Sequence, residues 1–136
     1  MMKILTFYIN NKKYGVSIDN IITIEKNDRK ITDIPKTNPI IRGVVNVRSR
    51  ICPVIDLRMY LENEENELNE DKKLILFDIN EKNGALLVDN TDNIMDVNTE
   101  NIEEFESDRV KTKVVNQDND VFVLIEINDF DDFLEH

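Results

Sequence analysis

The sequence PIIRGVVNVRSRICPVIDLRMYL, residues 39–61, contains two β-branched runs on either side of a short polar corner. The runs 43–47 and 51–55 predict two strands, and residues 48–50 predict the sharp turn between them. A helical turn is expected over residues 39–42, and Asp56 is expected to cap a short helix that begins at Leu57. The stretch contains no acid–base pair, no nucleophile beside a base and no phosphate loop. It therefore predicts a surface that binds a partner rather than a catalytic site.

Short strands recur along the rest of the chain. Further strands are expected over residues 4–9, 13–16, 21–26, 74–79, 84–89, 93–97, 110–116 and 121–127. Short helices are expected over residues 99–106 and 130–134, and the acidic segment 62–73 is expected to be an exposed loop. Strands of this length and spacing indicate an all-β fold, either small barrels or a sandwich.

Charge is distributed unevenly along the chain, which has a formal net charge of −11. Residues 1–61 carry 11 Lys/Arg and 5 Asp/Glu, whereas residues 62–136 carry 6 and 23. One interpretation is simply a soluble acidic protein, and the other is a protein whose two halves present different faces to different partners. The acidic total argues against a nucleic-acid partner, because binding phosphates requires concentrated positive charge.

Composition excludes several other classes of protein. The longest apolar runs reach only five residues, so no membrane insertion is expected, and the amino end lacks the features of a signal peptide. A single cysteine, Cys52, excludes an internal disulfide, and a cytoplasmic location is expected. No cofactor is expected. The acidic cluster within residues 100–108 lacks the glycine of a calcium loop, so no metal site is expected either.

The order of residues in the 39–61 stretch resembles the signature of the CheW family, the chemotaxis coupling proteins, which reads GVxNLRGxIxPVxDL. The corresponding residues are Gly43, Val44, Asn46, Val47, Arg48, Ser49, Ile51, Pro53, Val54, Asp56 and Leu57, of which Val47 and Ser49 stand where the signature has leucine and glycine. The segments 14–24, 31–35 and 84–89 are also similar to family segments. The resemblance covers residues 4–134, although the glycine-rich segment that the family has near its last hairpin is missing here.

The resemblance implies a fold of two five-stranded, SH3-like β-barrels, with short helices, packed around a shared hydrophobic core. Residues 1–136 would form one domain, with one subdomain over residues 1–62 and the other over residues 72–134. The final Leu-Glu-His is typical of an expression tag, so residues 134–136 are expected to be tag-derived.

The resemblance also implies a receptor-binding surface. Arg48 matches the arginine of the family turn, and Ile21, Thr23 and Ile51 lie in segments that match the receptor groove. Val88 is included because its strand is expected to leave one face free. The alternatives are a solvated turn arginine at Arg48 and core positions for the three aliphatic residues. Two departures stand out. Thr23 replaces a frequent glutamate, and Ser49 replaces a glycine.

The function that the resemblance implies is a non-catalytic adaptor. It would link the cytoplasmic tips of chemoreceptors to the regulatory domain of the histidine kinase CheA through protein–protein contacts. A CheW-like scaffold or competitor in another histidine-kinase pathway is the alternative, motivated by the departures at Thr23 and Ser49. An enzyme that uses paired carboxylates is a third reading, and it would show a concave pocket with converging carboxylates.

Overall fold

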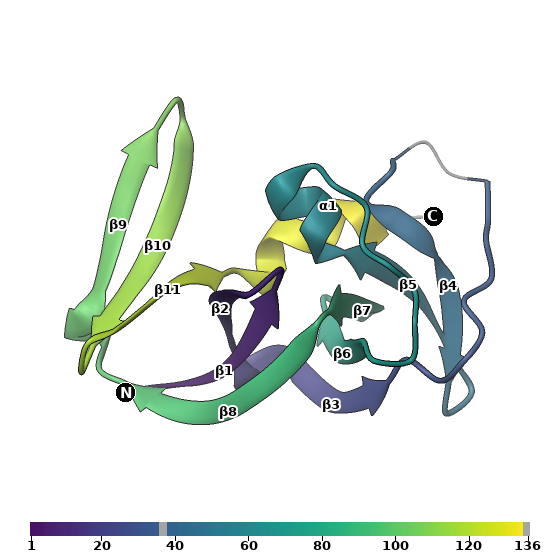
Figure 1. The fold of residues 1–136 in the computed structure, drawn as a ribbon, viewed down its shortest axis with the longest axis horizontal. Coiled ribbons are helices and arrows are strands. Elements are labelled where there is room, and N and C mark those ends of the chain that lie inside the picture. Colours follow the sequence, from purple (N-terminus) through teal and green to yellow (C-terminus); the bar gives the residue numbers. More distant parts are fainter. Residues whose placement is uncertain (36–37, 135–136) are drawn as a thin grey trace.

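The computed structural model describes residues 1–35 and 38–134, and they form two antiparallel-rich sheets joined by short helices (Figure 1). The six-stranded sheet has the order β8-β1-β2-β11-β10-β9. Its strands are β1 (Met2–Ile9), β2 (Lys12–Ser17), β8 (Asn90–Val97), β9 (Ile102–Ser107), β10 (Val110–Gln117) and β11 (Asp120–Ile125). The five-stranded sheet has the order β3-β6-β7-β5-β4. Its strands are β3 (Ile21–Lys26), β4 (Ile41–Val47), β5 (Arg50–Asp56), β6 (Lys73–Ile79) and β7 (Lys82–Val88).

The helices are short and lie between or after the strands. They are the 3-10 turns η1 (Ile18–Asn20) and η2 (Thr99–Asn101), the α-helix α1 (Leu57–Glu62) and the 3-10 helix η3 (Ile127–Leu134). The expected fold class, all-β with short helices and two packed sheets, is confirmed. One sheet has six strands where five were expected.

Each sheet takes strands from both sides of the 62–72 segment. The first two strands of the chain join the sheet of β8 to β11, while β6 and β7 join the sheet of β3 to β5. Two parallel pairings, of β11 with β2 and of β5 with β7, join strands that are distant in the sequence. The expected division into residues 1–62 and 72–134 therefore does not coincide with the two sheets.

The hydrophobic interior has a shared part and a separate part in each sheet. The largest cluster joins residues of both sheets to η3, which contributes the fully buried Phe130 and Leu134. A second cluster fills the five-stranded sheet around Val54 and Leu87, and a third fills the six-stranded sheet around Ile4 and Phe122. The shared cluster is the common core expected of two packed barrels. Leu134 belongs to it, and residues 135–136 of the expected tag lie outside the described residues.

Buried polar contacts hold the 63–72 segment, which was expected to be an exposed loop. Asp56 is fully buried; it accepts hydrogen bonds from the backbone N–H of Met59, as the expected helix cap, and from the N–H of Asn66. Arg42 Nη1 lies 2.8 Å from the Asp56 carboxylate and 2.6 Å from the carbonyl oxygen of Asn66. Asn66 is only 3% exposed, so this loop is anchored in its middle although its flanks are exposed.

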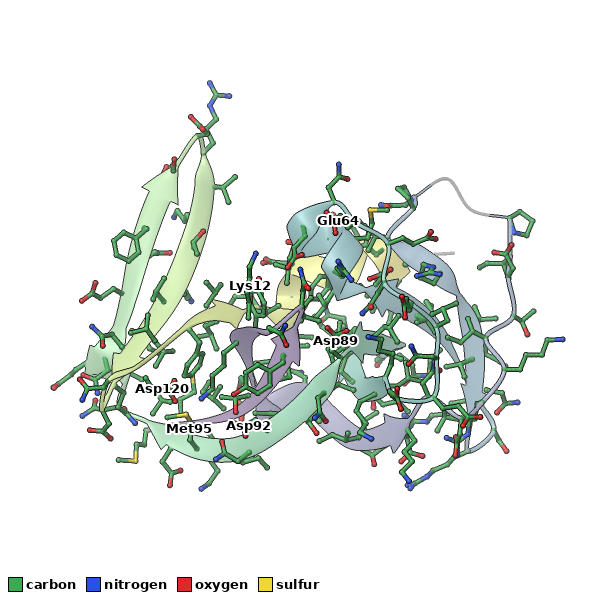
Figure 2. All side chains as sticks on the ribbon, viewed as in Figure 1. Lys12, Glu64, Asp89, Asp92, Met95 and Asp120 are labelled. Carbon is green, nitrogen blue, oxygen red and sulfur yellow. The ribbon has the colours of Figure 1, made fainter. Side chains whose placement is uncertain are left out.

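A second polar cluster ties this loop to the junction of the two sheets. Figure 2 shows Asp89 near the centre of the molecule, and its carboxylate accepts hydrogen bonds from Asn10, Asn66 and Lys72. Burial alone would raise the pKa of Asp89. The three hydrogen bonds and the Lys72 charge outweigh burial and lower the pKa below its ordinary value. The cluster therefore favours the ionised carboxylate in the folded protein.

Two local expectations from the sequence are wrong. Residues 99–106 form a single 3-10 turn, capped by Asn98, followed by the strand β9, instead of a helix. The tertiary reason is the pairing of β9 with β10 from Ile102 to Ser107. The helical turn expected over 39–42 covers only residues 39–40, because β4 begins at Ile41.

Candidate partner-binding surface

The turn between β4 and β5 has an unfavourable backbone conformation for its residues. Arg48 and Ser49 have φ angles of 53° and 70°, in the left-handed region. The structure has four other two-residue turns of this kind, and each begins with Asn or Asp, at Asn10, Asn80, Asp108 and Asp118. Asn and Asp adopt this conformation more readily than residues with longer side chains. The first position of the Arg48–Ser49 turn therefore carries more backbone strain than the first position of the other four turns.

Arg48 stands at the tip of this turn with its side chain in solvent. Its side chain is 69% exposed, and Nη2 lies 3.8 Å from a carboxylate oxygen of Glu25 on β3. Such a long and exposed ion pair contributes little to folding, with typical values of about 0–1 kcal/mol. The guanidinium therefore retains most of its hydrogen-bonding capacity for a partner.

Thr23 and Arg48, which the sequence singles out independently, meet through Glu25. Thr23 Oγ1 donates a hydrogen bond of 3.3 Å to Glu25, and Glu25 is in turn the ion-pair partner of Arg48. The family frequently has a glutamate where Thr23 stands. In this chain a carboxylate next to the arginine comes instead from Glu25, two residues further along the same strand. Sequence reasoning missed Glu25, because nothing local pairs it with residue 48.

A shallow hollow of about 250 Å³ lies beside this turn. Thr23, Arg48, Arg50 and Asp78 contribute to its lining, together with the exposed Ile22. Arg50 pairs with Asp78 at 3.2 Å across β5 and β6, so its charge is already matched. The hollow has an apolar floor and a polar rim, an arrangement suited to receiving side chains of a protein partner.

The other predicted contact residues have different environments. Ile51 is 58% exposed and therefore lies on the surface, as expected. Ile21 is half-buried and packs against the main core. Val88 is fully buried, because β7 is a central strand of the five-stranded sheet and is covered on both faces. Val88 cannot touch a partner in this structure, so its expected place on the surface is corrected.

Two surface isoleucines on β3 were missed by the sequence prediction. Ile22 and Ile24 are 45% and 38% exposed, whereas Ile21, Thr23 and Glu25 are half-buried. Alternate residues of a strand point to opposite faces, so Ile21 lies on one face of β3 and Ile22 and Ile24 lie on the other. Because both faces carry isoleucine, the apolar pattern did not show which face is exposed.

A second and larger groove of about 490 Å³ lies between the β9–β10 hairpin and the helices α1 and η3. Its lining includes Tyr60, Val110 and Asp129. Lys113 Nζ lies 2.6 Å from a carboxylate oxygen of Glu126 at its edge, a contact that raises the pKa of Lys113. Burial, followed by the charge of Glu126, raises the pKa of Asp129. In residues 1–35 and 38–134 no group of three or more His, Cys, Asp or Glu side chains is arranged to hold a metal ion.

Comparison with known proteins matches this sequence and this fold to one family. The family model described as CheW-like domain matches residues 3–131. This chain belongs to the CheW-like family. A chemotaxis protein CheW of Bacillus subtilis is 30% identical over 132 residues, which are 93% of this chain and 84% of the relative. A second CheW, of Thermotoga maritima, is 40% identical over 60 residues, 43% of this chain and 38% of that protein.

A solved structure agrees with the sequence relatives. The crystal structure of the scaffolding protein TtCheW of Thermoanaerobacter tengcongensis superposes with a TM-score of 0.80 and 26% identity, over 93% of this chain and 89% of that one. The expected family membership is therefore confirmed. None of the helices in the described residues is long and apolar enough to cross a membrane.

Proposed function

We propose that this chain is a non-catalytic adaptor of a chemotaxis pathway, coupling the cytoplasmic tips of chemoreceptors to the regulatory domain of the kinase CheA. The observation that carries this proposal is membership of the CheW-like family over nearly the whole chain. The names of the relatives, chemotaxis protein and scaffolding protein, support the same role. These partners place the role in the cytoplasm.

The Arg48 turn is the proposed receptor-binding surface. Arg48 stands on a strained turn, makes one long ion pair and lies beside a hollow whose lining includes the exposed Ile22. Backbone strain is retained at functional sites because the surrounding structure imposes it. Exposed apolar side chains are supplied by Ile22 and Ile24 on β3, the strand of the Glu25 partner, and by Ile51 on β5, which follows the turn. A receptor helix would pack apolar residues against them and place an acidic or amide group near the guanidinium.

The adaptor works by tethering. Simultaneous binding of two partners raises the effective concentration of the kinase near the receptor without new chemistry. It also transmits a signal when one partner has two conformations and the adaptor prefers one of them. The proposed role requires two separable surfaces and no catalytic group.

Calorimetric titrations test this proposal directly. The chain is titrated with a soluble receptor-tip fragment and, separately, with the kinase regulatory domain of the same organism. Binding to both is expected. Arg48→Glu should weaken binding of the receptor fragment at least tenfold and leave binding of the kinase domain unchanged. Arg109→Glu is the matched control, because Arg109 is also an exposed arginine in a two-residue turn.

Other outcomes discriminate between the alternatives. Binding to the kinase domain alone would favour a scaffold or competitor in another histidine-kinase pathway, the role that Thr23 and Ser49 motivate. Binding to neither would overturn the adaptor role and leave only the family fold. Equal losses for Arg48→Glu and Arg109→Glu would show that Arg48 acts only through net charge.

A further inference from the structure

The β9–β10 hairpin projects from the body of the protein with one open edge (Figure 1). β9 ends the six-stranded sheet, so one row of its backbone N–H and C=O groups has no strand beside it. Among the described elements, only β10 packs extensively against β9. Residues 103–107 are all exposed. Unpaired backbone groups on such an edge are a template for pairing with an added strand.

The side chains of β9 divide into two faces. Ile102, Glu104 and Glu106 lie opposite Val115, Lys113 and Lys111 of β10, and this face continues from the buried Val115. Glu103, Phe105 and Ser107 lie on the other face, since alternate residues of a strand point to opposite sides. Phe105 is 54% exposed there, and Val110, opposite Ser107, is 62% exposed. The free edge therefore presents carboxylates on one face and an aromatic side chain on the other.

The carboxylates of this edge form no ion pair within the described residues, although Lys111 stands opposite Glu106 on the same face. Lys113 stands opposite Glu104 but is bound to Glu126 at 2.6 Å. None of the ion pairs found in the described part of the chain involves Glu103, Glu104 or Glu106. The negative glutamates of β9 would repel β9 of a second copy of this chain, and the net charge of −11 adds to that repulsion.

We propose that the open edge of β9 binds an extended basic segment of another protein by strand addition. The added strand would alternate Lys or Arg with apolar residues. Its cations would lie beside Glu104 and Glu106, and its apolar side chains beside Phe105. Main-chain hydrogen bonds would supply much of the affinity, and the charge pattern would select the partner. This inference goes beyond the adaptor role and does not depend on the Arg48 surface.

A synthetic peptide tests the proposal. The probe is a blocked heptapeptide of alternating lysine and valine, and the control is a peptide of the same composition with the lysines in one block. Amide chemical shifts of the whole chain are followed by NMR during the titration, at low and at high salt. The alternating peptide should bind more tightly than the block peptide, and more weakly as salt rises. The largest shifts should fall in residues 102–107.

Charge reversal on the edge supplies the second arm. The double variant Glu104→Lys with Glu106→Lys should weaken binding of the alternating peptide at least tenfold. Glu67→Lys with Glu70→Lys is the matched control, since it makes the same change in net charge in the exposed part of the 63–72 loop. Equal losses in both double variants, shifts centred outside β9, or no preference for the alternating peptide would overturn the proposal. Self-association of the wild-type chain through residues 102–107 would also overturn it, in favour of a second copy.

Discussion

The β4–β5 hairpin and the β9–β10 hairpin are built alike but have opposite environments. Both end in two-residue turns with positive φ angles, at Arg48–Ser49 and at Asp108–Arg109. Beyond its tip, the first hairpin forms one side of the five-stranded sheet and contributes Val45, Val47 and Val54 to the buried cluster of that sheet. In the second, residues 103–111 are all exposed. The comparison separates strands whose buried side chains stabilise the fold from strands whose side chains are exposed to solvent.

The largest effect is expected at Asp56, at the end of β5. Asp56→Ala leaves Arg42 without its buried partner and removes both the helix cap and the anchor of Asn66. Breaking a buried charge pair from one side typically costs about 3–5 kcal/mol. Urea unfolding should therefore show a loss of that size. A loss below about 1 kcal/mol would mean that this network is not a main support of the five-stranded half.

Core truncation should distinguish the two regions directly. Leu86→Ala removes a fully buried side chain from the central strand β7 and should cost about 2–5 kcal/mol. Phe105→Ala on the exposed hairpin should change stability by no more than about 0.5 kcal/mol. Thermal and urea unfolding of both variants measure the contrast. Similar losses in the two variants would remove the distinction between the regions.

Acid should weaken the junction between the sheets. The folded pKa of Asp89 is below its ordinary value of 3.8, so the ionised carboxylate contributes stability at and above that pH. This contribution is lost as the pH falls through the folded pKa, below about pH 4. Asp89→Asn should lower stability at pH 7 and flatten the loss between pH 5 and 3, as measured by urea unfolding at each pH. An unchanged pH dependence would contradict this role.

The last prediction is a gain in stability at the strained turn. Ser49→Gly allows the positive φ of 70° without the penalty of a Cβ atom and should stabilise the chain by about 1 kcal/mol. Arg109→Gly is the matched control, because its φ is 67° in the other hairpin. If Ser49→Gly gains stability but weakens receptor-fragment binding, the strained turn is maintained for binding.

Much of the fold was predictable from local patterns. The β-branched runs, the Asn-rich corners and the cap at Asp56 each reflect a preference that acts within a few residues. The family motif in residues 39–61 also located the Arg48 turn correctly. These features depend on residues that are close together in the chain, and the sequence shows those residues directly.

The tertiary structure decided what depends on distant partners. Residues 102–107 became a strand because β10 offered a hydrogen-bonding edge, although a short helix was expected over residues 99–106. Val88 became fully buried because β6 and β5 flank its strand and both faces are covered. Glu25 reached Arg48 because the ends of β3 and β4 meet in space. The sequence by itself determined most of the elements and the family. Long-range pairing decided which faces are buried and which remain available to a partner, because burial is a property of the assembled sheets.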